Sequence, residues 1–229
     1  NTPLQVDIDL IAMSTHESKN TSKAHLYRFY KTFEDIKHQK YDGMIITGAP
    51  VEMLDFSEVN YWEELESIMD FANTNVYSTL FICWASQAAL YYYYGVEKYP
   101  LEEKMFGIFS HQLLRVRDIT KGFDDEFFAP HSRHTENRPQ DLAKLPQLKI
   151  LAQSDEAGVL LSATTDQRHY FISGHMEYDA LTLKEEYEGD EQRGFKFVKQ
   201  YLTINRSELF FADKVICIEG DTERILMPR

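Results

Sequence analysis

The chain has 229 residues, 43% of them hydrophobic, which suits one α/β domain or one domain plus a fragment. Its formal net charge of -13, from 24 basic and 37 acidic residues, repels phosphate backbones and excludes general nucleic-acid binding. Only two cysteines are present, Cys83 and Cys217, which excludes a disulfide framework and favours a reducing cytoplasm. We find no apolar run of membrane-spanning length and no signal peptide, so we expect no membrane partner. Because the first residue is Asn1 and the opening residues already read as strand, we expect further sequence upstream.

The first half of the chain predicts alternating strands and helices. Apolar and acidic residues alternate over 4–12, which predicts a half-buried strand, and helical spacing of apolar residues predicts a helix over 24–36. Between them, 18–21 is polar and turn-like. After a turn at 41–43, we expect a strand at 44–46 with a loop at 47–50, a helix over 61–72, a strand over 78–82 and a helix over 85–94.

The second half has more strand character. Three short strands are expected at 148–153, 158–163 and 169–173, followed by a loop at 174–179 and a helix at 181–188. Strand–helix alternation followed by strands predicts a three-layer α/β domain with a largely parallel central sheet. In such sheets the functional site lies beyond the carboxyl ends of the strands. Cys83 and the loops 47–50 and 174–179 all follow expected strands, so we expect them to meet at one edge.

Cys83 stands between the apolar strand that ends at Ile82 and a segment rich in Ala, Gln and Leu. This pattern is typical of a nucleophile elbow, in which a sharp turn places a reactive side chain at a helix N-terminus. Free backbone N–H groups and the helix dipole there favour a thiolate and a developing oxyanion. The alternative is an inert buried cysteine, which is common at strand ends.

A cysteine nucleophile needs a base, and the base needs a group that orients it. His175 and Glu177 are the best pair, because residues two apart in an extended segment point the same way and Gly174 permits a tight exit from the strand. His131 and His134 lie in an expected polar loop, 129–134, that could line a site. A metal site at these two histidines is an alternative, but no third ligand accompanies them.

Several longer segments carry a specific family resemblance. They are 2–7, 17–21, 41–50, 81–84, 122–125, 129–133 and 174–179, with the wording TPLQVD, ESKNT, YDGMIITGAP, FICW, GFDD, APHSR and GHMEYD. Through them the chain resembles the homoserine O-acyltransferases of the MetA type over residues 1–194. The resemblance implies a class I glutamine-amidotransferase-like, flavodoxin-like α/β fold.

The resemblance also implies a ping-pong acyl transfer in methionine biosynthesis. Cys83 matches the residue that carries the acyl group as a thioester, His175 the general base and Glu177 its orienting carboxylate. Lys104 and Ser132 match substrate-contacting positions. The substrates expected are acetyl-CoA and L-homoserine, with no cofactor and no metal. The resemblance implies a homodimer, and the cysteine usage places it in the cytoplasm.

Glu52 is the clue to the acyl donor. In the family, glycine at this position goes with succinyl-CoA and glutamate with acetyl-CoA. A carboxylate fills space and repels the free carboxylate of a succinyl group, which favours acetyl transfer. The alternative is a surface glutamate without a role in specificity. The expected activity is therefore that of a homoserine O-acetyltransferase.

The chain departs from the family in four ways. The family has a first strand and a lysine-bearing turn at positions before Asn1, and a chain without them would expose a sheet edge. Gly189 stands in place of an arginine that holds the homoserine carboxylate, and Met176 in place of a proline between His175 and Glu177. These changes leave open a second interpretation, a truncated or fused and catalytically impaired acyltransferase.

The fourth departure is the tail, 195–229. It resembles the start of a Toprim domain of OLD-type nucleases, with the wording RSELFFADK and EGDTER. Glu219 and Glu223 would match acidic Mg²⁺-site positions after the apolar strand 215–218, but the later acidic residues are missing. A nuclease fragment is therefore a distant alternative. We expect the tail to supply one helix and one strand, and that strand could pair with the open sheet edge.

Overall fold

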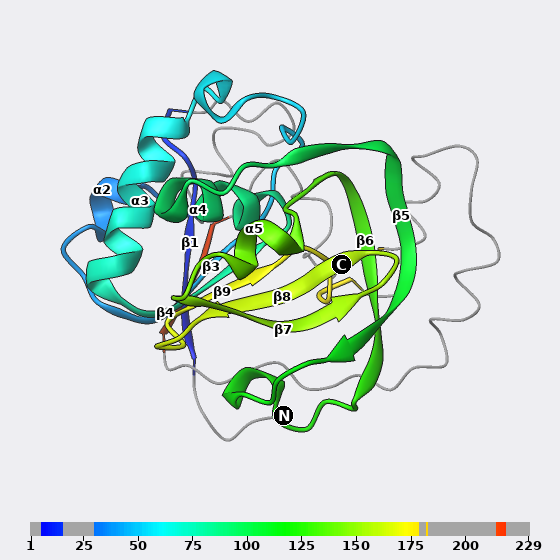
Figure 1. The fold of residues 1–229 in the computed structure, drawn as a ribbon. Helices are drawn as coiled ribbons and strands as arrows, with labels where there is room; N and C mark the ends of the chain where they lie inside the picture. The colour runs from blue at the N-terminus through cyan, green and yellow to red at the C-terminus, as the bar shows by residue number, and fades with distance from the viewer. Residues whose placement is uncertain (1–5, 16–29, 179–181, 183–213, 219–229) are drawn as a thin grey trace.

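A computed structural model describes residues 6–15, 30–178, 182 and 214–218. In these residues, ten strands form one sheet in the order β2-β1-β10-β3-β4-β9-β8-β7-β5-β6 (Figure 1). The strands are β1 Asp7–Ile11, β2 Tyr30–Lys31, β3 Tyr41–Ile46, β4 Val76–Ile82, β5 Tyr99–Leu113, β6 Glu126–Glu136, β7 Leu148–Ser154, β8 Gly158–Thr164, β9 His169–Ile172 and β10 Lys214–Ile218. The predicted α/β fold class is confirmed.

The sheet has a parallel part and an antiparallel part. Strands β2, β1, β10, β3, β4 and β9 run parallel, and from β9 outward each of β8, β7, β5 and β6 pairs antiparallel with the strand before it. The three late strands predicted from the sequence are β7, β8 and β9. The long hairpin of β5 and β6 was not predicted; it curves away from the helices in Figure 1.

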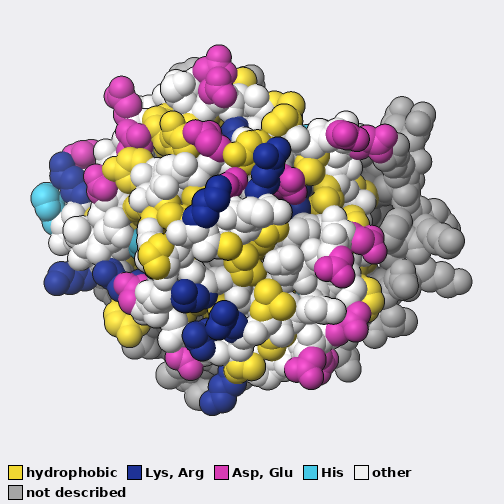
Figure 2. All heavy atoms as spheres, in the orientation of Figure 1, with side chains coloured by type: hydrophobic (Ala, Val, Ile, Leu, Met, Phe, Trp, Pro, Cys, Tyr) yellow, Lys and Arg dark blue, Asp and Glu magenta, His cyan; other side chains and the backbone are white. Residues whose placement is uncertain are grey.

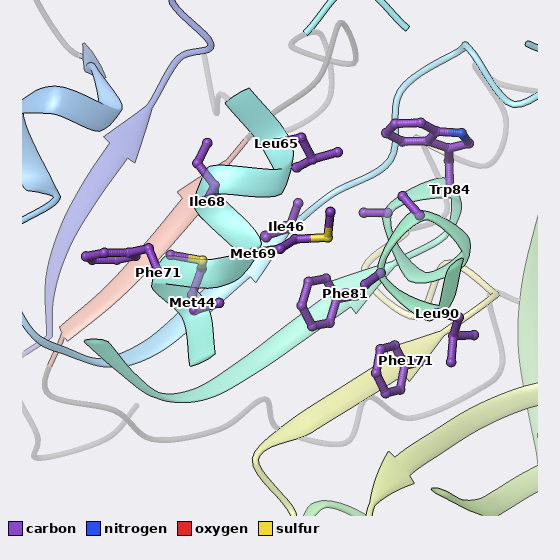
Figure 3. Close-up of a cluster of buried hydrophobic side chains, with 14 of the residues drawn as sticks. Met44, Ile46, Leu65, Ile68, Met69, Phe71, Phe81, Trp84, Leu90 and Phe171 are labelled. Carbon is purple, nitrogen blue, oxygen red and sulfur yellow. The ribbon is translucent and has the colours of Figure 1, made fainter. Parts of the chain in front are cut away.

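Helices cover the parallel part of the sheet. They are α2 Phe33–Ile36, α3 Trp62–Asn75 and α4 Trp84–Tyr94, with α5 Pro139–Ala143 beside β7 and two short 3₁₀ turns, η1 Phe56–Glu58 and η2 Asp118–Thr120. In α3, Leu65, Ile68, Met69 and Ala72 recur at helical spacing and are all buried. Figure 3 shows Leu65, Ile68 and Met69 in one cluster with side chains of β3, β4 and β9, among which Phe81 and Phe171 stack at 5.4 Å between ring centroids. This core fixes α4, and with it the residue that precedes α4.

The C-terminal strand β10 lies inside the sheet. It pairs parallel with β1 on one side and with β3 on the other, so that Cys217 is in register with Leu10 and Ile45. The expectation that the tail supplies a strand for this sheet is confirmed. Because both sides of β10 carry a backbone ladder, the strand lies within the sheet, between β1 and β3.

Three local expectations need correction. Of the expected helix 24–36 the structure describes residues 30–36, in which Tyr30–Lys31 is the short strand β2 and Phe33–Ile36 is helical. The expected turn at 41–43 is the start of β3. The segment 129–134, expected as a polar loop, lies in the interior of β6. The described residues do not include 16–29 or the tail outside β10. Of the helix expected at 181–188, they include only Thr182.

The surface of the described part is mixed in charge. On the face seen in Figure 2, lysine and arginine side chains lie among acidic and apolar ones, with acidic groups along one edge. None of the described helices has the length and apolar character to cross a membrane.

Candidate active site

Cys83 is the junction between β4 and α4. Its backbone has φ 55° and ψ -122°, a conformation that a non-glycine residue rarely adopts and that often marks a functional position. Its N–H donates to the carbonyl of Ile172 at 2.7 Å, which ties the turn to the end of β9. The side chain is a free thiol with intermediate exposure. The predicted elbow is therefore present.

Gly48 follows β3 and lies against this turn. A Cβ atom at Gly48 would come within 3.1 Å of the Trp84 nitrogen and 3.2 Å of the Cys83 Cβ. Trp84 is the first residue of α4, where backbone N–H groups have no carbonyl four residues earlier in the helix. A glycine at position 48 thus keeps the space beside Cys83 and the first N–H of the helix open, where an oxyanion would be bound.

His175 and Glu177 lie in the loop that follows β9. The His175 Nδ1–H donates to the Glu177 carboxylate at 2.8 Å, so the Nε2 atom is left for the Cys83 side chain, to which His175 is also hydrogen-bonded. Burial lowers the pKa of His175, but the charge of Cys83 and the hydrogen bonds to Cys83 and Glu177 raise it, and the net shift is well above the usual value. An imidazolium beside a thiol favours the thiolate.

Neighbouring strands hold the His175 loop in place. The His175 N–H donates to the carbonyl of Pro130 in β6 at 2.8 Å, and the His175 and Tyr178 rings stack at 4.2 Å between centroids. Gly174 has no room for a side chain: a Cβ would lie 2.7 Å from a Leu160 methyl group and 2.8 Å from the Pro130 carbonyl oxygen. Although Met176 replaces the proline of the family pattern, the contact between His175 and Glu177 is intact.

Glu52 is connected to the elbow through two buried side chains. Its carboxylate accepts the His134 N–H at 3.0 Å and lies 3.4 Å from the Thr135 hydroxyl. Thr135 donates its one proton to Gln87 Oε1 at 2.7 Å, and the backbone N–H of Gln87 donates to the Cys83 carbonyl at 3.4 Å in the first turn of α4. Glu52 is therefore an anchored side chain rather than a loose surface carboxylate.

Lys104 and Ser132 lie on the β5–β6 hairpin. Ser132 is buried and in register with Phe106, and the Lys104 ammonium lies 5.5 Å from the centroid of the Phe106 ring. The two positions therefore gather around one residue of β5, on the hairpin whose Pro130 carbonyl binds the His175 backbone. Their contact with a substrate remains a prediction.

The sequence reading missed a buried polar group on this hairpin. Arg133, with 2% of its surface exposed, donates to His131 Nδ1 at 3.3 Å, to the Thr135 carbonyl at 2.8 Å and to the Ala157 carbonyl at 2.6 Å. Had 129–134 been read as a strand, the two-residue spacing would have placed His131 and Arg133 on one face.

The metal alternative at His131 and His134 is not supported by this geometry. His131 is fully buried, both its ring nitrogens are already in hydrogen bonds, and the Arg133 guanidinium lies beside it. Within the described residues, no three His, Cys, Asp or Glu side chains are grouped so that they could hold a metal ion.

The fold and the strand-end position of these residues define the class of protein. A glutamine amidotransferase from Thermotoga maritima superposes with a TM-score of 0.58 at 12% identity, covering 85% of this chain and 90% of that one. A glutamine amidotransferase from Methylobacillus flagellatus gives a TM-score of 0.56 at 14% identity, covering 82% of this chain and 76% of that one. The fold is thus that of the class I glutamine amidotransferases.

Sequence comparison identifies the family within this class. The homoserine O-succinyltransferase family profile matches residues 1–214, and the chain belongs to this family. A homoserine O-acetyltransferase of Acetivibrio thermocellus is 57% identical over 197 residues, covering 86% of this chain and 65% of the relative. One from Brevibacillus brevis is 57% identical over 195 residues, covering 85% and 64%. The chain therefore spans about two thirds of the length of these curated relatives, or slightly less.

Proposed function

We propose that this chain transfers an acetyl group from acetyl-CoA to the hydroxyl of L-homoserine through a thioester on Cys83, a step of methionine biosynthesis. The observation that carries the proposal is the hydrogen-bonded series Cys83–His175–Glu177 at the carboxyl ends of β4 and β9. It is supported by the homoserine O-acetyltransferases that are 57% identical to most of this chain.

In the first half-reaction, the Cys83 sulfur, whose proton is held by His175, attacks the carbonyl carbon of acetyl-CoA. The oxyanion that forms is stabilised by N–H groups at the start of α4, beside Gly48. When the tetrahedral intermediate collapses, the bond to the CoA sulfur breaks and His175 returns the proton to that sulfur. The products are free CoA and acetylated Cys83.

In the second half-reaction, His175 accepts the proton of the homoserine hydroxyl as its oxygen attacks the thioester carbon. The bond between carbon and the Cys83 sulfur breaks, and the sulfur leaves as a thiolate beside the imidazolium. Glu177 keeps the same ring nitrogen of His175 facing the reaction throughout. O-acetylhomoserine is released and the resting ion pair is restored.

Glu52 is proposed to select the acetyl donor. Its carboxylate is held by the His134 N–H, so it cannot move away from a longer acyl chain without losing that hydrogen bond. A succinyl group would bring a second carboxylate toward this position. We expect acetyl-CoA to load Cys83 faster than succinyl-CoA, and Glu52→Gly to reduce or reverse this preference; faster succinyl loading of the unchanged chain would contradict the proposal.

Lys104 and Ser132 are proposed to contact the substrates from the β5–β6 hairpin. Lys104→Met and Ser132→Ala should raise the KM for a substrate more than they lower the rate of the bound complex. If both variants have the same KM values as the unchanged chain for both substrates, Lys104 and Ser132 do not contact the substrates.

The decisive experiment is intact-mass measurement of the full chain with acetyl-CoA alone. We expect a mass increase of one acetyl group that is absent in Cys83→Ser, and its loss when L-homoserine is added. A folded chain that forms no adduct would overturn the catalytic proposal. An adduct that persists with homoserine would support the alternative of an impaired enzyme, for which Gly189 is the first candidate cause.

The remaining proposals concern the setting of the reaction. We propose a homodimer in the cytoplasm that needs acetyl-CoA as a substrate and no bound cofactor. Light scattering on the purified chain tests the dimer, and loading assays after extensive dialysis against chelator test the absence of a cofactor requirement.

A further inference from the structure

Two buried histidines face each other across the β5–β6 hairpin. His111 and His131 are both fully buried, their rings stack at 5.1 Å between centroids, and their Nε2 atoms are 3.0 Å apart. The other nitrogen of His111 lies 2.9 Å from the Phe109 carbonyl oxygen, and that of His131 accepts from Arg133 Nε at 3.3 Å. All four ring nitrogens are thus engaged.

The groups at the two ends of this series, the Arg133 guanidinium and the Phe109 carbonyl, determine which nitrogen of each imidazole ring carries the proton. A guanidinium can only donate, so His131 Nδ1 must be an acceptor and the proton of neutral His131 is on Nε2. That N–H donates to His111 Nε2, which leaves the His111 proton on Nδ1, facing the Phe109 carbonyl. The result is a one-way relay of hydrogen bonds from Arg133 through His131 and His111 to a backbone carbonyl.

Protonation of either ring would break this relay, because two N–H groups would then oppose each other. The surroundings keep both rings neutral: burial, together with the Arg133 charge, lowers the pKa of His111 to about 4 and that of His131 well below its usual value. Besides Arg133, the ring of His175 acts on His131 in the same direction. Glu136, Cys83 and Glu52 act on Arg133 and favour its charged form.

The relay lies directly behind the base. The His131 Cε1 atom would be 3.2 Å from a Cβ at Gly174, and the residue before His131 supplies the carbonyl that binds the His175 N–H at 2.8 Å. The orientation of the His131 ring therefore limits where the Gly174–His175 backbone can lie. The position of the His175 ring relative to Cys83 depends on this backbone.

We propose that His111 and Arg133 are positioning residues, which hold the His131 ring so that Pro130–His131 forms a fixed support for His175. The support sets the contact between His175 and Cys83 and thereby the reactivity of the thiol. This inference rests on the assignment of Cys83 and His175 in the proposed function, but it does not depend on the acyl donor or acceptor.

The test compares His111→Gln with His111→Phe in the full chain. Glutamine can place an acceptor oxygen where the Nε2 atom of His111 lies, whereas phenylalanine fills the same space and leaves the His131 N–H unpaired. The readout is the rate of Cys83 alkylation by iodoacetamide as a function of pH, quantified by peptide mass mapping, with thermal melting as a control for folding. This reaction reports the thiolate at Cys83 and needs neither acetyl-CoA nor homoserine.

For His111→Phe we expect alkylation at neutral pH to slow by roughly tenfold to a hundredfold, with a midpoint at higher pH, because a small displacement of a reacting pair has effects of this size. For His111→Gln we expect a rate within about twofold of the unchanged chain. A folded His111→Phe with the unchanged pH profile would overturn the proposal, as would a His111→Gln that is as slow as His111→Phe.

A second measurement applies even if His111→Phe does not fold. Long-range ¹⁵N–¹H correlation spectra of the unchanged chain at pH 7 should show His131 with its proton on Nε2 and His111 with its proton on Nδ1. A charged ring or the opposite tautomer at either position would overturn the relay. Should the relay and the alkylation results hold while no acetyl adduct forms, the proposed function would fail and the positioning role would stand.

Discussion

Replacing Glu177, the carboxylate that orients His175, should slow thioester formation, and the loss should be larger for alanine than for glutamine. The His175 Nδ1–H donates to Glu177 at 2.8 Å, and the side chains are 12% and 27% exposed. Hydrogen bonds to a charged group contribute about 1.5–3 kcal/mol, and the partial exposure of Glu177 favours the lower value. Glu177→Gln keeps an acceptor oxygen and loses only the charge, so we expect a loss of roughly tenfold in rate. Glu177→Ala also leaves the Nδ1–H unpaired, and a total of about 3 kcal/mol gives roughly a hundredfold loss.

The same variants should change the pH dependence. Glu177 raises the pKa of His175 through a hydrogen bond and its charge, so Glu177→Gln lowers that pKa. The imidazolium that protonates the leaving CoA sulfur is then lost at lower pH, and the alkaline limb of the rate profile moves toward acid.

The assay is single-turnover acetylation of Cys83, followed by quenched-flow mass measurement between pH 6 and 10. Glu126→Gln is the matched control, because Glu126 accepts a hydrogen bond from Ser110 at 2.5 Å on an exposed part of the β5–β6 hairpin. It should leave the acetylation rate unchanged. If Glu177→Ala is no slower than Glu177→Gln, or if neither profile moves, the orienting role of Glu177 is refuted.

Three further perturbations test other parts of the structure. Gly48→Ala places a methyl group 3.1 Å from the Trp84 nitrogen, so Cys83 acetylation should slow by roughly tenfold or more with little change in melting temperature; equal rates would contradict an oxyanion site there. Deleting 214–229 removes β10 and should lower the melting temperature by about 10 °C or more, which calorimetry can measure. His169 is buried with its pKa lowered to about 4, and among described residues its Nε2 has no hydrogen-bond partner. As the pH drops from about 6.5 to 4, this histidine takes up a proton in the unfolded chain before it does so in the folded chain, so the free energy of unfolding falls. His169→Phe should flatten this urea-unfolding slope by up to about 1.4 kcal/mol per pH unit, and an unchanged slope would exclude His169 as its source.

The parts of the site that could be predicted are those encoded within a few neighbouring residues. The elbow at Cys83 combines an apolar strand, one reactive residue and a helix-forming segment. His175 and Glu177 are two residues apart in one loop. The parallel order of β3, β4 and β9 then brings the strand ends together, because parallel strands share one carboxyl edge.

The parts that could not be predicted depend on contacts between distant segments. Glu52 meets the His134 N–H across 82 positions, and Thr135 meets Gln87 across 48. The strand β5 was missed because its first half, with Glu102 and Glu103, lacks the alternation of apolar residues that marks a half-buried strand. Without β5, the segment 129–134 has no neighbouring strand to pair with, and its histidines then suggest a polar loop.

The position of β10 shows that the sheet and the site place different demands on the sequence. Four of its five residues lie beyond the 214 residues that match the family, yet it is paired on both sides within the sheet. A parallel ladder is made by backbone groups, so a short run of β-branched residues such as Val215-Ile216 can fill the slot without family-specific side chains. The site is less tolerant, because it needs Gly48, Cys83 and His175 at the ends of three adjoining strands. Since β10 pairs with β3 and Gly48 lies two residues after the end of β3, the backbone of β10 can help determine where the proposed oxyanion side of the site lies.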